Sequence, residues 1–440
     1  MLTFDDLVRA FHQRLDQLPD HRRQGNNTTY EIKDAVLGAF AVFFTQSPSF
    51  LAHQRRMQET KGRSNAQTLF GIKQTPTDPQ IRNLLDPLNP THLFPLFPLI
   101  LAQLHQAGEL ASFRDFNDTL LVPLDGTQYF SSQKIHCLQC RRRTLGKGET
   151  LYSHSVIIPV GVKPGQPQVL PLEPEFILPQ DGATKQDCEQ GAAKRWLRRC
   201  GASYAAYRIT LLGDDLYCHQ PLCQLALDQS MNFIFVCKPD SHIHLYEWLN
   251  FLQAGPNEQL PTLTRRHWNG QFAEIWTYGY INDVPLRAGA GALFVNWAEL
   301  TIIREDSGEQ LYHNAFAPNY ELTQTTVKPI VQAGQTRWKV ENEGNNVLKN
   351  RGYHLEHNFG HGQQHLSTVL LTLNLLAFLF HTILHLVDNP YRRLREHLAA
   401  RQTFFNAVQT LTRYLCFENW DHLLNFMINQ LELDISPAPT

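Results

Sequence analysis

Apolar side chains recur at helical spacing along the first part of the chain. They return every three or four residues across positions 4–15 and again across 32–44. This period is typical of helices with one buried face. We therefore predict a helical region over residues 1–115.

The pattern changes to short apolar runs from about residue 116. Such runs predict buried strands, and here they alternate with segments of helical period. The predicted strands cover residues 119–124, 155–162, 168–172, 208–212 and 233–236, and the predicted helices cover 185–199 and 221–227. This alternation predicts an α/β core with some parallel pairing.

Two further regions complete the expected organisation. Residues 255–332 have the pattern of strands and turns, whereas the chain beyond them is strongly helical, apart from a stretch near residue 360 that is rich in glycine and histidine. We therefore predict a β-rich insertion at 255–332, with strands at 272–280, 292–295 and 300–304, between a core of residues 116–254 and 333–390, followed by a C-terminal helical region at 391–440.

One predicted helix, at residues 369–387, is apolar enough to resemble a membrane span. It contains Asn374, His381 and His385, which are costly to place in lipid. We therefore predict a buried core helix and no association with a membrane.

Composition and charge narrow the class of protein. Hydrophobic residues make up 42% of the 440 positions, which indicates a folded chain with a large core. The net charge of -2 does not favour nucleic-acid binding, but DNA contact needs only local positive potential. Basic clusters that can supply this potential, or can form plain solvated faces, lie at 55–56, 61–63, 141–143, 198–199 and 265–266.

The cysteines and the first residues indicate a compartment. The eight cysteines are scattered, unlike a disulfide framework, and Asp5 and Asp6 stand where a signal peptide would carry base. We therefore expect a reducing, cytoplasmic environment.

Two apolar runs end in aspartate, Asp125 after residues 122–124 and Asp214 after 210–213. Side chains at strand ends of an α/β sheet converge on a ligand. A carboxylate at such a place needs a partner, and a divalent cation is one. Either aspartate alone is equally explained by a turn or capping role.

A third acid lies on the predicted helix that begins at Arg337. Glu341 is four residues after Arg337 and shares its face, and Lys349 lies about 80° away around the helix. Glu343 faces the other way, so it is the alternative to Glu341. Two aspartates and one glutamate are hard ligands that suit Mg²⁺ or Mn²⁺, and two such ions can drive phosphoryl transfer without a protein nucleophile.

Three segments resemble bacterial insertion-sequence transposases of the DDE type, which have a ribonuclease-H-like core. They are Leu124-Asp125-Gly126-Thr127, Leu212-Gly213-Asp214-Asp215-Leu216-Tyr217 and Arg337-Trp338-Lys339-Val340-Glu341-Asn342-Glu343, the last continuing through Leu348-Lys349 to His354. The resemblance spans about residues 120–385. It implies an α/β fold with a ribonuclease-H-like mixed sheet, a β-rich insertion and an N-terminal helical DNA-binding region.

The resemblance also implies roles for single residues. Asp125, Asp214 and Glu341 would hold Mg²⁺ or Mn²⁺ and act in catalysis, supported by Arg337 and Lys349. Tyr217, three residues after Asp214, favours that acid over Asp215. The family signature has tyrosine where this chain has Gly334, and lysine where it has Leu348.

The implied activity is cleavage at transposon ends and transfer of a 3′ hydroxyl to target DNA. The expected partners are double-stranded DNA and a second copy of the chain, in association with the bacterial nucleoid. Arg265, Arg266 and Trp268 suit DNA contact by charge and stacking, with Trp276 and Trp297 as rivals. No P-loop occurs, so no nucleotide cofactor is expected.

Cysteine and histidine residues supply a second metal hypothesis. Cys137 and Cys140 form a CxxC pair that would need two more ligands for structural Zn²⁺, with His154 and Cys188 as candidates, and the favoured alternative is a pair of plain reduced thiols. Four histidines at 354, 357, 361 and 365 are interrupted by glycines, which favours structural hydrogen bonds over a metal site.

Three rival functions remain open at this point. One is a ribonuclease-H-like nuclease that does not join strands, and another is a DNA-binding remnant that no longer cuts. The third is a zinc-dependent hydrolase that uses the histidine-rich stretch.

Overall fold

The computed structural model describes residues 4–20, 22, 29–57, 64–146, 148–179, 188–254 and 260–434. The basic cluster at 61–63 and the predicted helix start at residue 185 lie outside these ranges. Within them the chain is mixed α/β, with a seven-stranded mixed sheet and helices at both ends of the chain. The predicted fold class is confirmed at this level.

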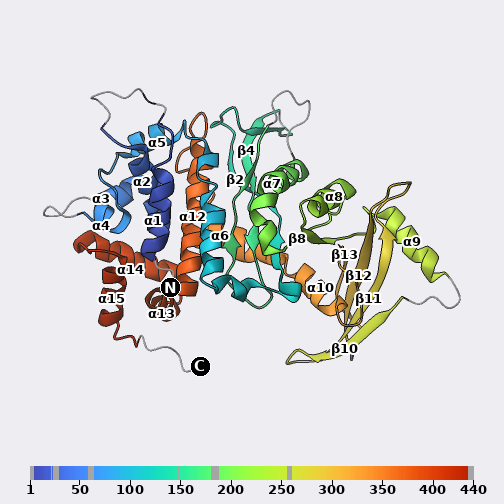
Figure 1. Ribbon diagram of the computed structural model, residues 1–440. Helices are drawn as coiled ribbons and strands as arrows, with labels where there is room; N and C mark the ends of the chain where they lie inside the picture. Colours follow the sequence, from blue (N-terminus) through green and yellow to red (C-terminus); the bar gives the residue numbers. More distant parts are fainter. Residues whose placement is uncertain are drawn as a thin grey trace.

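The helices from the two ends of the chain pack together into one helical body. Asn65 donates to the carbonyls of Thr412 and Leu415, and the Trp420 indole donates to the Leu69 carbonyl. The N-terminal members are α1 (Phe4–Leu15), α2 (Ile32–Phe44), α3 (Phe50–Met57), α4 (Asn65–Phe70), α5 (Asp78–Leu85) and α6 (Leu96–Gln106), and the C-terminal members are α12 (Leu366–Val387), α13 (Asn389–His397), α14 (Arg401–Tyr414) and α15 (Trp420–Gln430). Figure 1 shows this body on the left, where the blue N-terminal helices pack beside the orange to red C-terminal helices.

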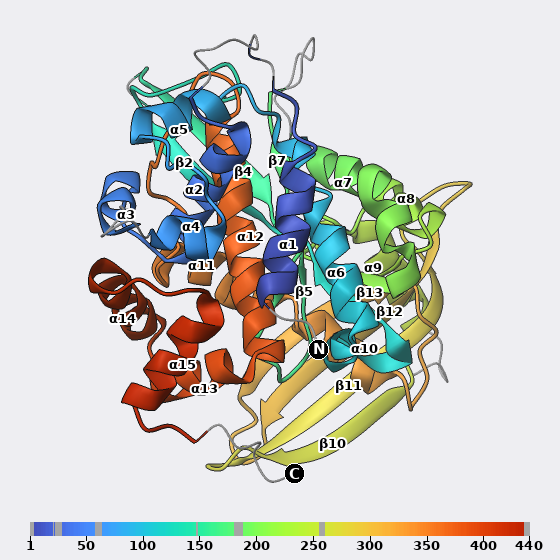
Figure 2. The same ribbon diagram turned by 60° about the vertical axis from the view of Figure 1, so that its left-hand side comes forward.

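Helix α12 runs through the middle of the helical body, beside α1 and α2 (Figure 2). By length and composition it is the one described helix that could cross a membrane, and 89% of its most apolar window is buried inside the protein. Both ring nitrogens of His381 are hydrogen-bonded: Nδ1 to the Tyr353 hydroxyl, and Nε2, as the donor, to the Phe44 carbonyl. Asn374 donates to the Tyr353 carbonyl. The predicted buried core helix is therefore present.

Three parallel strands form one end of the seven-stranded sheet, in the order β1 (Leu120–Pro123), β8 (Ile209–Gly213) and β9 (Asn232–Val236). All their side chains except that of Asn232 are buried, as expected for strands covered on both faces. Two helices connect these strands and pack on the sheets, α7 (Glu189–Tyr204) and α8 (Gln220–Asp228).

An antiparallel sheet continues from β1. Strand β2 (Gly126–Ser132) follows after two residues, and β4 (Thr150–Ile157) pairs with it. The isolated bridge between Leu121 and Val162 has the same register as the pair of Gly126 with Ile157. Strands β1 and β2 are therefore one continuous, bent segment, which pairs with the segment that returns from Thr150 to Val162. The remaining strands here are β3 (Arg141–Thr144), β5 (Val160–Gly161), β6 (Leu170–Pro171) and β7 (Glu175–Ile177).

The predicted β-rich insertion is an antiparallel meander that extends the large sheet. Its last strand pairs with β9, so the sheet order is β1-β8-β9-β13-β12-β11-β10. The meander consists of β10 (Thr262–Trp268), β11 (Ala273–Pro285), β12 (Phe294–Arg304) and β13 (Gln310–Pro318), preceded by α9 (Ile243–Gln253), and lies on the right of Figure 1. The strands predicted at 292–295 and 300–304 belong to one strand, because β12 runs without a break from Phe294 to Arg304.

The chain returns from the meander to the core through short helical pieces. These are α10 (Val327–Gln335), a π-helical turn η5 (Val340–Asn345) and α11 (Asn346–Asn350). The predicted regular helix through residues 337–349 therefore contains a π-turn, a feature that is common at functional sites. Short 3-10 turns occur at Pro90–His92, Glu109–Phe113, Phe116–Asp118 and Ala205–Tyr207.

Asn65→Ala should destabilise the protein, because it removes three hydrogen bonds that join the two ends of the chain. Besides its two donated bonds, the side chain accepts from the Phe417 amide at 3.0 Å. We expect a loss of about 2–4 kcal/mol in the free energy of unfolding, measured by urea titration. Gln67→Ala, at an exposed position of the same helix, should change it little. Equal effects of the two substitutions would contradict this account.

Candidate functional site

The parallel pairing of β1 with β8 sets Asp125 beside Asp214. Pro123 pairs with Leu212, and the Leu124 amide donates to the Leu212 carbonyl at 2.8 Å. Asp125 follows two residues after Pro123 and Asp214 two residues after Leu212, and the charge of Asp214 acts on Asp125. The two predicted strand-end acids therefore lie at neighbouring strand ends, where the sheet opens toward solvent.

The electrostatic environment of Asp125 brings in the third acid. Burial raises the pKa of Asp125 to about 6, with further increases from the negative charges of Glu189, Asp214 and Glu341 and an opposing effect from Arg337. The charges of Asp214, Glu341 and Arg337 thus all act on Asp125. The cost of holding these charges together is the kind that a bound cation offsets.

Glu189 is a fourth acid, which the sequence analysis missed. It lies in the first turn of α7, where its Oε1 accepts from the Gly126 amide at 3.0 Å and from the Tyr217 hydroxyl at 2.5 Å. A Cβ at Gly126 would lie 2.5 Å from the Glu189 carboxylate, so a larger residue at this position would displace the Glu189 side chain. The sequence feature that could have indicated Glu189 is its position, as an acid at the start of the helix that follows the antiparallel strands.

The structure distinguishes Asp214 from Asp215. One oxygen of Asp214 accepts from the Leu216 amide at 2.9 Å, and this bond closes the turn after β8. Asp215 accepts from the Lys238 amide at 2.7 Å and from the Ser241 hydroxyl, and lies 3.3 Å from the His242 ring. Asp215 therefore fastens the loop after β9, and Asp214 is the acid that faces Asp125.

The π-turn η5 places Glu341 and Glu343 differently. Glu341 is exposed and acts on Asp125, whereas Glu343 lines a separate cavity of about 780 Å³ with Trp338 and Lys339. On the same turn, Asn345 donates to Asp125 at 3.3 Å. The geometry therefore agrees with the preference for Glu341.

At the two positions where the chain departs from the family signature, the residues present are determined by packing. Gly334, in place of the family's tyrosine, has no room for a side chain, because a Cβ would lie 2.8 Å from the Phe316 ring. Leu348 is fully buried, and Lys349 is ion-paired with Glu356 at 2.9 Å. The supporting role predicted for Lys349 would need that ion pair to open.

The acids do not form a compact ligand cluster. Among the described residues, groups of three or more ligand atoms within 4.8 Å of one another occur at two places, and both contain cysteine and histidine. The separation of the carboxylates is physically expected, because like charges repel one another when no cation lies between them.

The first of these groups consists of Cys137, Cys140, His154 and His361, all buried. It can hold a metal ion. The predicted CxxC pair and His154 are members, whereas the other candidate, Cys188, is exposed at the start of α7 and lies outside it. His361 is a candidate ligand that the sequence analysis did not select, because it favoured structural hydrogen bonds over a metal site for the histidine-rich stretch.

The second group consists of Cys218, Cys237 and His242. It lies behind the Asp214 strand end, where His242 also contacts Asp215. With three ligands from protein, this group is less complete than the first.

The aromatic and basic residues predicted to contact DNA lie in the meander. Trp268, at the end of the edge strand β10, is 62% exposed, whereas Trp297 is buried. Trp276 is half-buried and donates to Glu274 at 2.8 Å. Of the three tryptophans, Trp268 is therefore the accessible one. Beside it, Arg265 is exposed and Arg266 is ion-paired with Glu305 at 2.7 Å.

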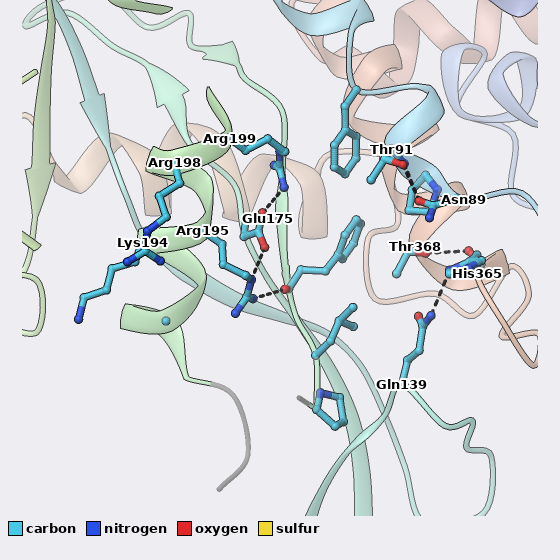
Figure 3. Close-up of a pocket in the computed structure, with 16 residues that line it drawn as sticks. Asn89, Thr91, Gln139, Glu175, Lys194, Arg195, Arg198, Arg199, His365 and Thr368 are labelled. Carbon is cyan, nitrogen blue, oxygen red and sulfur yellow. Dashed lines mark hydrogen bonds and ion pairs between the residues drawn. The ribbon is translucent and has the colours of Figure 1, made fainter. Parts of the chain in front are cut away.

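A basic cavity of about 590 Å³ lies between α7 and the segment that leads into α12 (Figure 3). Arg195 and Arg199 reach from α7 to Glu175, which neutralises part of their charge. Lys194 and Arg198 point away from Glu175 in Figure 3, and neither has an ion-pair partner in the described part of the chain. Of the predicted 198–199 cluster, Arg198 is thus the residue available to an anion.

Asp125→Asn should stabilise the metal-free protein at high pH. The pKa of Asp125 is raised to about 6 in the folded state, above the usual value near 4, so its ionisation disfavours folding above pH 6. The variant should be more stable than the parent at pH 8 by about 1–2 kcal/mol, and the difference should vanish as the pH falls through 6 toward 4.

Urea titrations in the presence of a chelator at pH 8, 6 and 4 measure this difference. Asp240→Asn, at an exposed position, is the control and should show no such trend. A stability difference for Asp125→Asn that is independent of pH would show that the carboxyl ionises normally.

No protein-family model and no curated protein sequence matches the chain. The function must therefore be argued from the geometry of the site and from the motifs that the sequence carries.

Proposed function

We propose that the chain is a metal-dependent DNA transposase that cuts at transposon ends and joins them to target DNA. The observation that carries this proposal is the shared electrostatic field of Asp125, Asp214 and Glu341. These acids come from two strand ends and a distant π-turn, and the turn-closing bond from the Leu216 amide to Asp214 does not explain why all three charges act together.

The order of the strands supports a ribonuclease-H-like core. Three antiparallel segments, built from β1–β2, β4–β5 and β6–β7, come first along the chain. Helix α7 then leads to β8, and α8 leads to β9, both parallel to β1. In space the segments lie in the order β6–β7, β4–β5, β1–β2, β8 and β9. Asp125 follows β1, and Asp214 follows β8.

The acids would act as ligands of Mg²⁺ or Mn²⁺. When bound, such ions supply a polarised attacking oxygen and stabilise the leaving oxygen of a phosphoryl transfer. Asp125, Asp214 and Glu341 would position the ions, and Arg337 would offset negative charge or hold a phosphate. Glu189 is a positioning residue, because it fixes the Gly126 amide and thus the bend that presents Asp125.

Several surfaces fit a DNA partner. Lys194 and Arg198 present unpaired positive charge on α7, and Trp268 presents an open ring at the edge of the meander. DNA would contact the strand ends that carry the acids and the basic residues of α7. Bringing two transposon ends together would require two copies of the chain, at the bacterial nucleoid in the cytoplasm.

Glu341→Gln should abolish DNA cleavage in Mg²⁺ or Mn²⁺ while leaving the fold intact. We expect a loss of about a thousandfold, as for an ion ligand whose contribution is several kcal/mol. The substrate is DNA carrying the sequences that flank the gene for this chain, and the assay scores both nicked and joined products.

Matched variants make this test specific. Glu343→Gln and Glu309→Gln remove acids of the same type from the neighbouring cavity and from an exposed turn of the meander, and should keep activity. Cleavage without joining by the parent protein would identify a nuclease. Absence of both products from the parent would favour a DNA-binding remnant, and full activity of Glu341→Gln would refute the assignment of that ligand.

Replacing Lys194 and Arg198 together by alanine should weaken DNA binding through lost phosphate contacts. The slope of log affinity against log salt concentration should become shallower by about 1.8, which corresponds to two phosphate contacts. Fluorescence anisotropy of a labelled duplex at several salt concentrations measures it. Arg304→Ala, whose charge is already paired with Asp306 at 2.6 Å, is the control. An unchanged slope in the double variant would exclude this surface.

A further inference from the structure

We propose that Cys137, Cys140, His154 and His361 bind one structural zinc ion, which clamps the antiparallel sheet to the segment that leads into α12. The proposal is independent of the DNA chemistry proposed above. It depends on the spacing of four buried ligand atoms, on their separation along the chain and on what they join.

The distances between the ligand atoms match the edges of a zinc tetrahedron. The two Sγ atoms are 3.9 Å apart, and His154 Nε2 lies 3.5 Å from Cys137 Sγ and 3.4 Å from Cys140 Sγ. His361 Nε2 lies 3.5 Å from Cys140 Sγ. With zinc–sulfur bonds of about 2.3 Å and zinc–nitrogen bonds of about 2.0 Å, tetrahedral geometry requires edges of about 3.8 Å between sulfurs and about 3.5 Å between sulfur and nitrogen.

The composition and burial of the group favour zinc in a structural role. Two thiolates and two imidazoles are a complete ligand set of the structural type, with no position left for a substrate. Each of the four residues is less than a tenth exposed, so the site is closed to solvent. The sulfurs are also much farther apart than the roughly 2.05 Å of a disulfide bond.

The ligands come from three parts of the chain. Cys137 and Cys140 lie between β2 and β3, His154 is on β4, and His361 lies 221 residues after Cys140 in the loop before α12. Gln139 and His365 add a hydrogen bond of 3.0 Å across the same junction. An ion at this place would therefore hold together the core sheet and the helical body.

Further contacts show that the loop with His361 is fixed from its other side. The Asp86 carboxylate accepts from the backbone amides of Gln363, Gln364 and Leu366, at 3.0 to 3.1 Å. The loop therefore has little freedom to move, and His361 is held in position for the ion by contacts that do not involve the cysteines.

Metal analysis of the purified full-length protein tests the proposal. Protein purified without added metal should contain one zinc ion per chain, which mild chelation leaves in place. Exchange for Co²⁺ should give the visible absorption bands of a tetrahedral site, together with thiolate charge-transfer absorption. Cys140→Ser and His361→Ala should each lose the zinc and lower the thermal stability.

Matched controls locate the ion. Cys188→Ser and His357→Ala, which change an exposed cysteine and an exposed neighbour in the histidine-rich stretch, should keep one zinc ion per chain. Cys218→Ser should keep it too, because that residue belongs to the second group. If a variant fails to fold, the content and cobalt spectrum of the parent still decide.

Three results would overturn the proposal. The first is folded parent protein without stoichiometric zinc, and the second is zinc that survives Cys140→Ser or His361→Ala. The third is a Cys137–Cys140 disulfide, detected by alkylation and mass spectrometry in protein purified under reducing conditions.

Discussion

Repulsion among acids at one end of the sheet is the constraint on which the rest of the site depends. Asp125, Asp214, Glu189 and Glu341 all contribute negative charge to one place, and the pKa of Asp125 rises to about 6 as a result of burial and of these neighbours. An arrangement of this kind reduces stability unless a cation offsets it. The surrounding structure must therefore hold the carboxylates against a force that separates them.

The backbone supplies that restraint through three different devices. Parallel pairing fixes Asp125 beside Asp214, since each follows a strand whose register is set by buried apolar residues. Glu189 accepts from the Gly126 amide and thereby holds the bend between β1 and β2. The π-turn η5 directs Glu341 and Asn345 to the same place. The acids are thus held by strand register, by a hydrogen bond from a backbone amide to Glu189 and by the π-turn.

Local patterns predicted the parts of the fold whose burial is regular, and missed those defined by long-range pairing. The fully buried strands β1, β8 and β9 and the core helix α12 were recognisable from apolar runs. Strands β2, β3, β7, β10 and β13 were missed; β3 and β10 are largely exposed and polar, whereas β7 is a buried run of only three residues. Glu189 and His361 were missed for a related reason, since each acts on partners more than 60 residues away.

The cysteine and histidine group and the separated carboxylates would offer a metal ion two different environments. The cysteine and histidine group is closed, buried and nearly tetrahedral before any ion is present, so an ion there would add stability with little rearrangement. The carboxylates lie apart at partly exposed positions. An ion there would have to draw mutually repelling carboxylates together, and it would remain accessible to a substrate. The segment from Glu341 to His361 joins both sites, so a clamp at one end of it would also limit the movement of the acid at the other.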